Sequence, residues 1–66
     1  MQHDAARIVD TRAWLAKALT DLLAADRLLH FDPPLAGAAV FHAQQAAEKV
    51  LKAFLAWHDD PFRKIR

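Results

Sequence analysis

The sequence contains no cysteine and no tyrosine, and only one glycine and three prolines. The absence of cysteine excludes disulfides and thiolate metal sites. The four histidines show no i, i+3 or i, i+4 pairing that would bind a metal, so we expect neither metal nor cofactor. A chain of 66 residues is at most one domain, and a domain of this size buries only about 60% of its unfolded surface. We therefore expect self-association to supply the missing stability.

The sequence also lacks an excess of either charge, because nine Lys and Arg side chains offset eight Asp and Glu side chains. The resulting net charge of +1 argues against binding nucleic acid mainly by electrostatics. No run of 18 or more apolar residues occurs, and the charged start (Asp4, Arg7, Asp10) is not typical of a signal peptide. These absences indicate a soluble cytoplasmic protein, and a hydrophobic content of 55% argues against disorder.

What the chain has in abundance is helix-forming residues: 15 of the 66 are Ala and nine are Leu. We expect a first helix from about residue 4 to about residue 30, because Pro33 and Pro34 then interrupt the chain. After a turn at 31–34, a second helix should run from about 35 to about 58 and leave a tail at 59–66. The sequence therefore predicts an all-α antiparallel helical hairpin, completed to a four-helix bundle by dimerisation.

Apolar residues mark one face on each predicted helix. On the first helix this face comprises Ile8, Leu15, Leu19, Leu22 and Leu29, and Trp14, Ala18 and Ala25 flank it. On the second helix Phe41, Leu51 and Leu55 form the centre, and the face spreads through Val40, Ala47, Phe54, Val50 and Trp57. One neighbouring helix cannot cover so broad a face. We therefore predict a partner interface at Phe41, Val50, Phe54 and Trp57.

Two polar side chains, Gln44 and Glu48, interrupt the apolar face of the second helix. In a hairpin that turns near Pro33, residue i should lie opposite about residue 66−i, which sets Leu22 opposite Gln44. Two interpretations stand. Either the polar pair is solvated and contacts Lys49 or Lys52, or it belongs to a polar network inside a bundle that fixes the register of the helices or lines a ligand cleft. We expect Glu48 to be at least partly buried and to contact a cation or a backbone donor.

Residues 41–55 read Phe-His-Ala-Gln-Gln-Ala-Ala-Glu-Lys-Val-Leu-Lys-Ala-Phe-Leu. This segment resembles the signature helix of HEPN (higher eukaryotes and prokaryotes nucleotide-binding) domains. The first helix is similar too, with Trp14, Ala18, Asp21-Leu22 and Ala25 at the spacing of that family. The segment Phe62-Arg63-Lys64-Ile65-Arg66 resembles the start of the next family segment. A whole HEPN domain is about twice this length, so the resemblance implies that residues 1–66 form a single partial domain, its first helical hairpin.

The resemblance implies a helical bundle, often a homodimer, that binds nucleotide or acts with a minimal nucleotidyltransferase in a toxin–antitoxin-like pair. The ligand-binding candidates are then Gln44, Gln45, Glu48, Lys49 and Lys52. Some HEPN domains are ribonucleases with an Arg-x4-6-His motif. No arginine here has a histidine five to seven positions downstream, so we expect no enzyme activity. The alternatives are an inert ribonuclease remnant and a purely structural hairpin.

Single residues outside these motifs have ordinary roles in our interpretation. We expect His42, Lys49 and Lys52 to lie on solvated helix surfaces, although a lysine can also contact a phosphate. Trp14 and Trp57 are interpreted as core or interface anchors. The basic residues of the tail, Arg63, Lys64 and Arg66, are interpreted as a soluble terminus.

Overall fold

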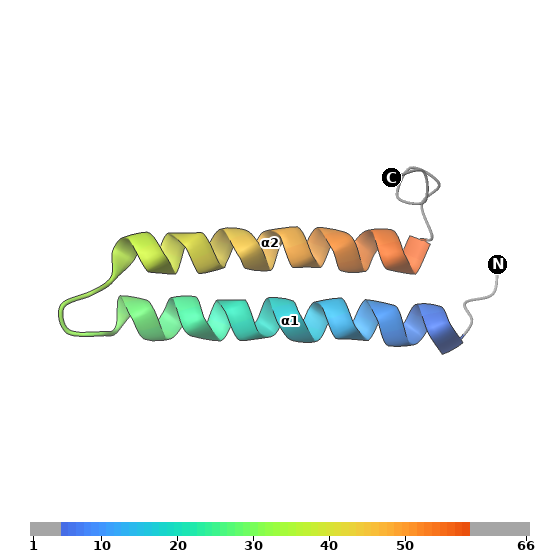
Figure 1. Cartoon of the computed structure of the whole chain (residues 1–66), viewed down its shortest axis with the longest axis horizontal. Coiled ribbons are helices and arrows are strands. Elements are labelled where there is room, and N and C mark those ends of the chain that lie inside the picture. The colour runs from blue at the N-terminus through green and yellow to red at the C-terminus, as the bar shows by residue number, and fades with distance from the viewer. Residues whose placement is uncertain (1–4, 59–66) are drawn as a thin grey trace.

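The computed structural model of the chain describes residues 5–58. Within this range the chain forms two helices, α1 (Ala5–Leu29) and α2 (Ala36–His58), and no strand. The helices lie side by side and antiparallel, joined by a short turn at one end (Figure 1). The predicted all-α helical hairpin is confirmed. The expected start near residue 4 and the tail at 59–66 lie outside the described residues.

The turn between the helices is built around the two consecutive prolines. The Asp32–Pro33 peptide bond is cis. Three backbone N–H groups return to the last carbonyls of α1: His30 donates to Asp26 (3.2 Å), and Phe31 (3.4 Å) and Leu35 (2.9 Å) donate to Leu28. Two of the four carbonyls that the end of α1 leaves without an intrahelical partner, those of Asp26 and Leu28, thereby accept hydrogen bonds from the turn.

The contact between the two helices is made of alanine. Every buried hydrophobic residue within residues 5–58 is an alanine: Ala18 and Ala25 on α1, and Ala39, Ala46, Ala53 and Ala56 on α2. Because a methyl group is the whole side chain, two helices that meet through alanines can approach more closely than helices that meet through leucines. The hairpin is a single layer of two closely packed helices (Figure 1).

The predicted packing faces are therefore wrong. On α1 the leucines that we expected to meet α2 are about half exposed, and the residues expected only to flank them (Trp14, Ala18, Ala25) make the contact. On α2 two residues of the expected centre, Phe41 and Leu51, are exposed, whereas the third, Leu55, is half-buried. The physical reason is that an isolated hairpin holds only one helix–helix contact. The alanine stripes occupy this contact and leave the larger apolar side chains for other surfaces.

Because the hairpin is a single layer of two helices, each helix packs against one neighbour and its other sides stay open (Figure 1). Neither α1 nor α2 is long and apolar enough to cross a membrane.

Candidate functional site

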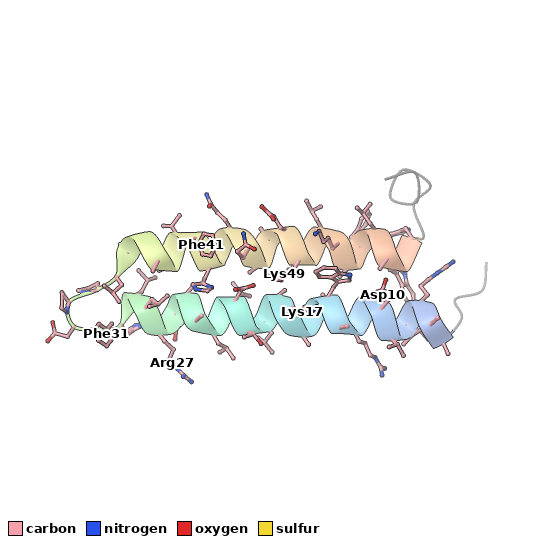
Figure 2. All side chains as sticks on the ribbon, viewed as in Figure 1. Asp10, Lys17, Arg27, Phe31, Phe41 and Lys49 are labelled. Carbon is pink, nitrogen blue, oxygen red and sulfur yellow. The ribbon has the colours of Figure 1, made fainter. Side chains whose placement is uncertain are left out.

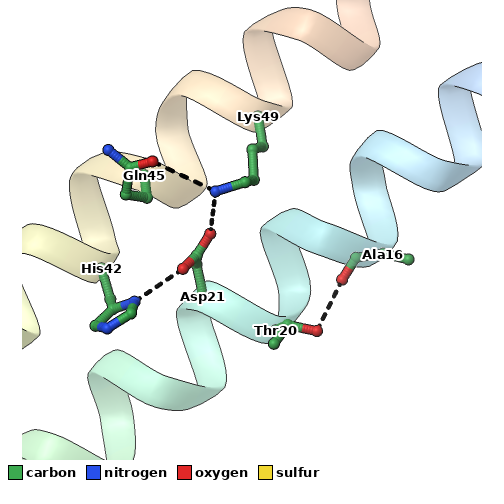
Figure 3. A network of polar contacts seen from close by, with 6 residues as sticks. All are labelled: Ala16, Thr20, Asp21, His42, Gln45 and Lys49. Carbon is green, nitrogen blue, oxygen red and sulfur yellow. Dashed lines mark hydrogen bonds and ion pairs between the residues drawn. The ribbon is translucent and has the colours of Figure 1, made fainter.

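A polar network joins the two helices near the middle of the hairpin (Figure 3). The Asp21 carboxylate of α1 uses both of its oxygens to contact α2. Oδ1 accepts a hydrogen bond of 2.8 Å from Nδ1 of His42, and Oδ2 lies 2.6 Å from Nζ of Lys49. Lys49 also donates to the side-chain oxygen of Gln45 at 3.4 Å, which completes a four-residue network.

The alanine contact explains how so short a side chain can bridge two helices. Asp21 lies three residues after Ala18 on the same face of α1, and His42 and Lys49 lie on either side of Ala46 along α2. Close backbones bring the carboxylate within reach of both donors. The Asp21 side chain is only 13% exposed, compared with 35% for His42 and 23% for Lys49. These side chains are half-buried at the seam and still accessible from one side.

The network holds Asp21 in its ionised form. The hydrogen bond from Lys49 and then the one from His42 lower the pKa of Asp21 below its ordinary value, and the charges of both groups act in the same direction. Partial burial opposes this shift because desolvation disfavours the charged form, but the hydrogen bonds outweigh it. Among residues 5–58 no three His, Asp or Glu side chains are grouped to hold a metal ion.

A second cluster surrounds Trp14 of α1, about two turns from Asp21 toward the N-terminus. Nζ of Lys17 lies 4.9 Å from the centroid of the indole, and Nζ of Lys52, from α2, lies 5.0 Å from it. Both distances are those of a cation–π contact. Lys17 and Lys49 lie on the same side of the hairpin, along the seam between the helices (Figure 2). Trp14 thus joins the helices as an interhelical anchor, as predicted for a core or interface tryptophan.

The opposite side of the hairpin is mainly apolar, with Asp26 as an exposed acidic residue on α1. At about 100° per residue, the leucines of α1 and two large residues of α2 lie about 40° to 100° round the helix from a buried alanine. In an antiparallel pair these rotations bring both sets to the same side, away from Asp21 and Trp14. We call this surface the two-helix face, and it comprises Leu15, Leu19, Leu22, Leu29, Val50 and Phe54. Each of these side chains is between 47% and 57% exposed, and Trp57 lies at the margin of the face.

The chain was also compared with known proteins. The family model of the HEPN domain matches residues 11–66. The chain belongs to the HEPN domain family. No match is found among curated proteins or among solved structures.

The HEPN hairpin separates the five predicted ligand-binding residues. Gln45 and Lys49 meet in the network around Asp21, and Lys52 contacts Trp14 on the same side. Gln44 and Glu48 lie on the exposed surface of α2 that points away from α1. The structure therefore brings three of the five candidates to one side of the hairpin and leaves the other two on a different side.

Two predictions about polar residues are wrong. Glu48 is exposed and has no hydrogen bond or ion pair within the described residues, because it lies on the side of α2 opposite the alanines. His42 and Lys49 are half-buried and bound to Asp21, whereas we expected solvated helix surfaces. Leu22 and Gln44, which we predicted to lie at the same level of the hairpin, are both exposed, and their exposure does not test that level.

The contacts that Asp21 makes with α2 were not predicted from the sequence. The sequence did contain a signal for them. Asp21 is level with about residue 45 in a hairpin that pairs i with 66−i, and the hydrogen-bond donors His42 and Lys49 lie on either side of that level. The rule fixes the level of a residue along the hairpin. It does not fix the rotation of each helix, and the rotation decides which side chains meet.

Proposed function

We propose that this HEPN chain is a helical binding module that forms a homodimer through the two-helix face and thereby builds a four-helix bundle. The observation that carries the proposal is the exposure of six large apolar side chains on one side of a two-helix layer. Monomeric proteins rarely expose contiguous apolar patches larger than a few hundred Å². A two-fold axis over the middle of this face would set the same leucines of two chains against each other.

The free energy gained by burying the apolar side chains of this face supports a partner there. Full burial of a Val, Leu or Phe side chain contributes about 1.5–3 kcal/mol relative to full exposure. The six residues are about half exposed, so covering them stabilises the assembly by about 1 kcal/mol each, or roughly 6 kcal/mol per chain. This sum approaches the whole free energy of unfolding of a small domain, which is about 5–15 kcal/mol.

A pair of charge substitutions tests the proposed dimer. Phe54→Asp inserts a carboxylate in the two-helix face and is expected to convert the dimer to a monomer. Arg27→Asp is the matched control, because Arg27 lies on the side of α1 that points away from α2 (Figure 2). Light scattering after gel filtration measures both masses. Equal masses for the two variants would contradict the assignment of this face.

We further propose that the module binds a nucleotide or a minimal nucleotidyltransferase on its polar side, in a toxin–antitoxin-like setting in the cytoplasm, and that the chain itself is not a ribonuclease. HEPN membership supports this proposal, as does the gathering of Lys17 and Lys52 at Trp14. A triphosphate would draw both lysines from the indole and change its fluorescence. Titration with ATP and GTP is expected to change Trp emission, and Lys52→Gln to weaken the response more than Arg27→Gln. Identical titrations would contradict a nucleotide site here.

A further inference from the structure

The outer edge of α2 carries a second apolar surface, distinct from the two-helix face. It lies on the side of α2 turned away from the buried alanines, and it comprises Val40, Phe41, Gln44, Glu48 and Leu51. The three apolar members are 55–62% exposed. Gln44 and Glu48 are exposed as well, and neither has a hydrogen bond or ion pair within residues 5–58. An unpaired carboxylate thus lies within a stripe of large apolar side chains.

A second copy of the chain is a poor occupant of this edge. A two-fold axis near the middle of the stripe would set Glu48 close to its own copy, and the two carboxylates would repel each other in a desolvated contact. Asp26 also lies on the side of the two-helix face, but its carboxylate lies 3.5 Å from Nδ1 of His30 on the same helix, whereas Glu48 has no such contact within the described residues. The two surfaces therefore differ in the partner that each favours, and the outer edge stays open when the two-helix face is covered.

A wholly apolar occupant is excluded by the same carboxylate. Burial of an ionised group without a partner costs far more than the apolar contacts around it contribute, so an occupant must supply a cation where it covers Glu48. The side chain of Gln44, one turn away, can then bond a polar group beside that cation. This requirement selects among partner helices. An acidic or uncharged helix would bury the Glu48 carboxylate without a cation, so it would bind more weakly than a helix that supplies one.

We propose that the outer edge of α2 is a docking site for an amphipathic helix of another protein, one that carries a single Arg or Lys within its apolar stripe. The edge runs from Val40 to Leu51, which is twelve residues or about 16 Å of helix. Three turns of a partner helix match this length, with an apolar stripe against Val40, Phe41 and Leu51 and the cation at the level of Glu48. Arginine fits best, since its guanidinium is planar and weakly hydrated and can bond a carboxylate through two N–H groups.

Labelled peptides of about 20 residues test the proposal with the full 66-residue chain. Three amphipathic helical peptides share one apolar stripe and differ only at its central residue, which is Arg, Leu or Glu. Fluorescence anisotropy measures their dissociation constants. The Arg peptide is expected to bind about tenfold more tightly than the Glu peptide. Glu48→Lys should reverse this order, and Glu48→Gln should remove the difference.

Two controls separate the edge from general charge attraction and from the rest of the surface. Asp26→Lys makes the same change in net charge on α1 and should leave the order of the three peptides as in the wild type. Leu51→Ser should weaken binding of the Arg peptide, whereas Leu23→Ser, at an exposed leucine of α1 outside both apolar surfaces, should not.

Several outcomes would overturn the proposal: equal affinities for the three peptides, tightest binding of the Leu or Glu peptide, no binding of any peptide at about 100 µM, or a reversed order with Asp26→Lys. None of these results bears on the dimer, because the mass of each variant is measured separately and Phe54→Asp tests that contact alone.

Discussion

Enlarging one alanine at the seam between the helices tests the packing directly. Ala46 lies in the alanine contact and is 2% exposed, whereas Ala47, its neighbour in sequence, is exposed. Replacing either with Leu adds the same three carbon atoms and barely changes helix propensity. Only Ala46→Leu must force these atoms between two closely spaced backbones.

The expected cost of Ala46→Leu follows from the density of the contact. Overpacking a well-packed core costs about 1–3 kcal/mol. In a domain of this size each kcal/mol lowers the melting temperature by about 4–8 °C, so we expect a decrease of roughly 4–20 °C. Displacing α2 would also stretch the contacts of Asp21 with His42 and Lys49, which places the effect toward the upper end of the range.

Thermal unfolding monitored by circular dichroism at 222 nm measures both variants at equal protein concentration. Ala47→Leu is expected to melt within a few degrees of the wild type. A melting temperature that falls for Ala47→Leu and not for Ala46→Leu would mean that the helices pack through the face we assign to the surface, and the reasoning from the alanine seam would be refuted.

Two further predictions concern the polar network and catalysis. The pKa of Asp21 is lowered in the folded chain, so its pairing stabilises the fold above the ordinary Asp value of about 3.9 and is lost as the pH falls through the lower folded value. Urea denaturation should therefore give the wild type a larger free energy of unfolding than Asp21→Asn near neutral pH. The difference between the two should disappear in strong acid. A difference that is independent of pH would contradict the ionised pairing. The purified chain should not cleave single-stranded RNA, and sustained cleavage that His42→Ala abolishes would overturn this expectation.

The sequence predicts the secondary structure of this protein well for physical reasons. Alanine and leucine favour helix throughout, and Pro33 and Pro34 allow the chain to reverse at one place only. Two helices joined by a short turn have little choice except to lie antiparallel. The position of the turn also predicts which residues of the second helix lie level with Asp21, because residue i then lies level with about residue 66−i.

The sequence does not predict the rotation of the helices. The usual assumption turns the most apolar face inward, and here that assumption selects leucines that remain exposed. A hairpin has one contact between its helices and several outer surfaces. The apolar periodicity does not tell which apolar stripe forms the contact and which stripes stay on the outer surfaces. The contacts of Asp21 with His42 and Lys49 depend on this rotation, so they could not be derived from spacing alone.

Sedimentation equilibrium of the wild-type chain, with circular dichroism at the same concentrations, tests the central claim most directly. The claim is that a second copy covers the two-helix face and contributes much of the stability of each hairpin. We predict a dimer at micromolar concentration, with a loss of helicity that follows dissociation on dilution. A fully helical monomer at the same concentrations would contradict the claim, because the exposed leucines and Phe54 would then need no partner.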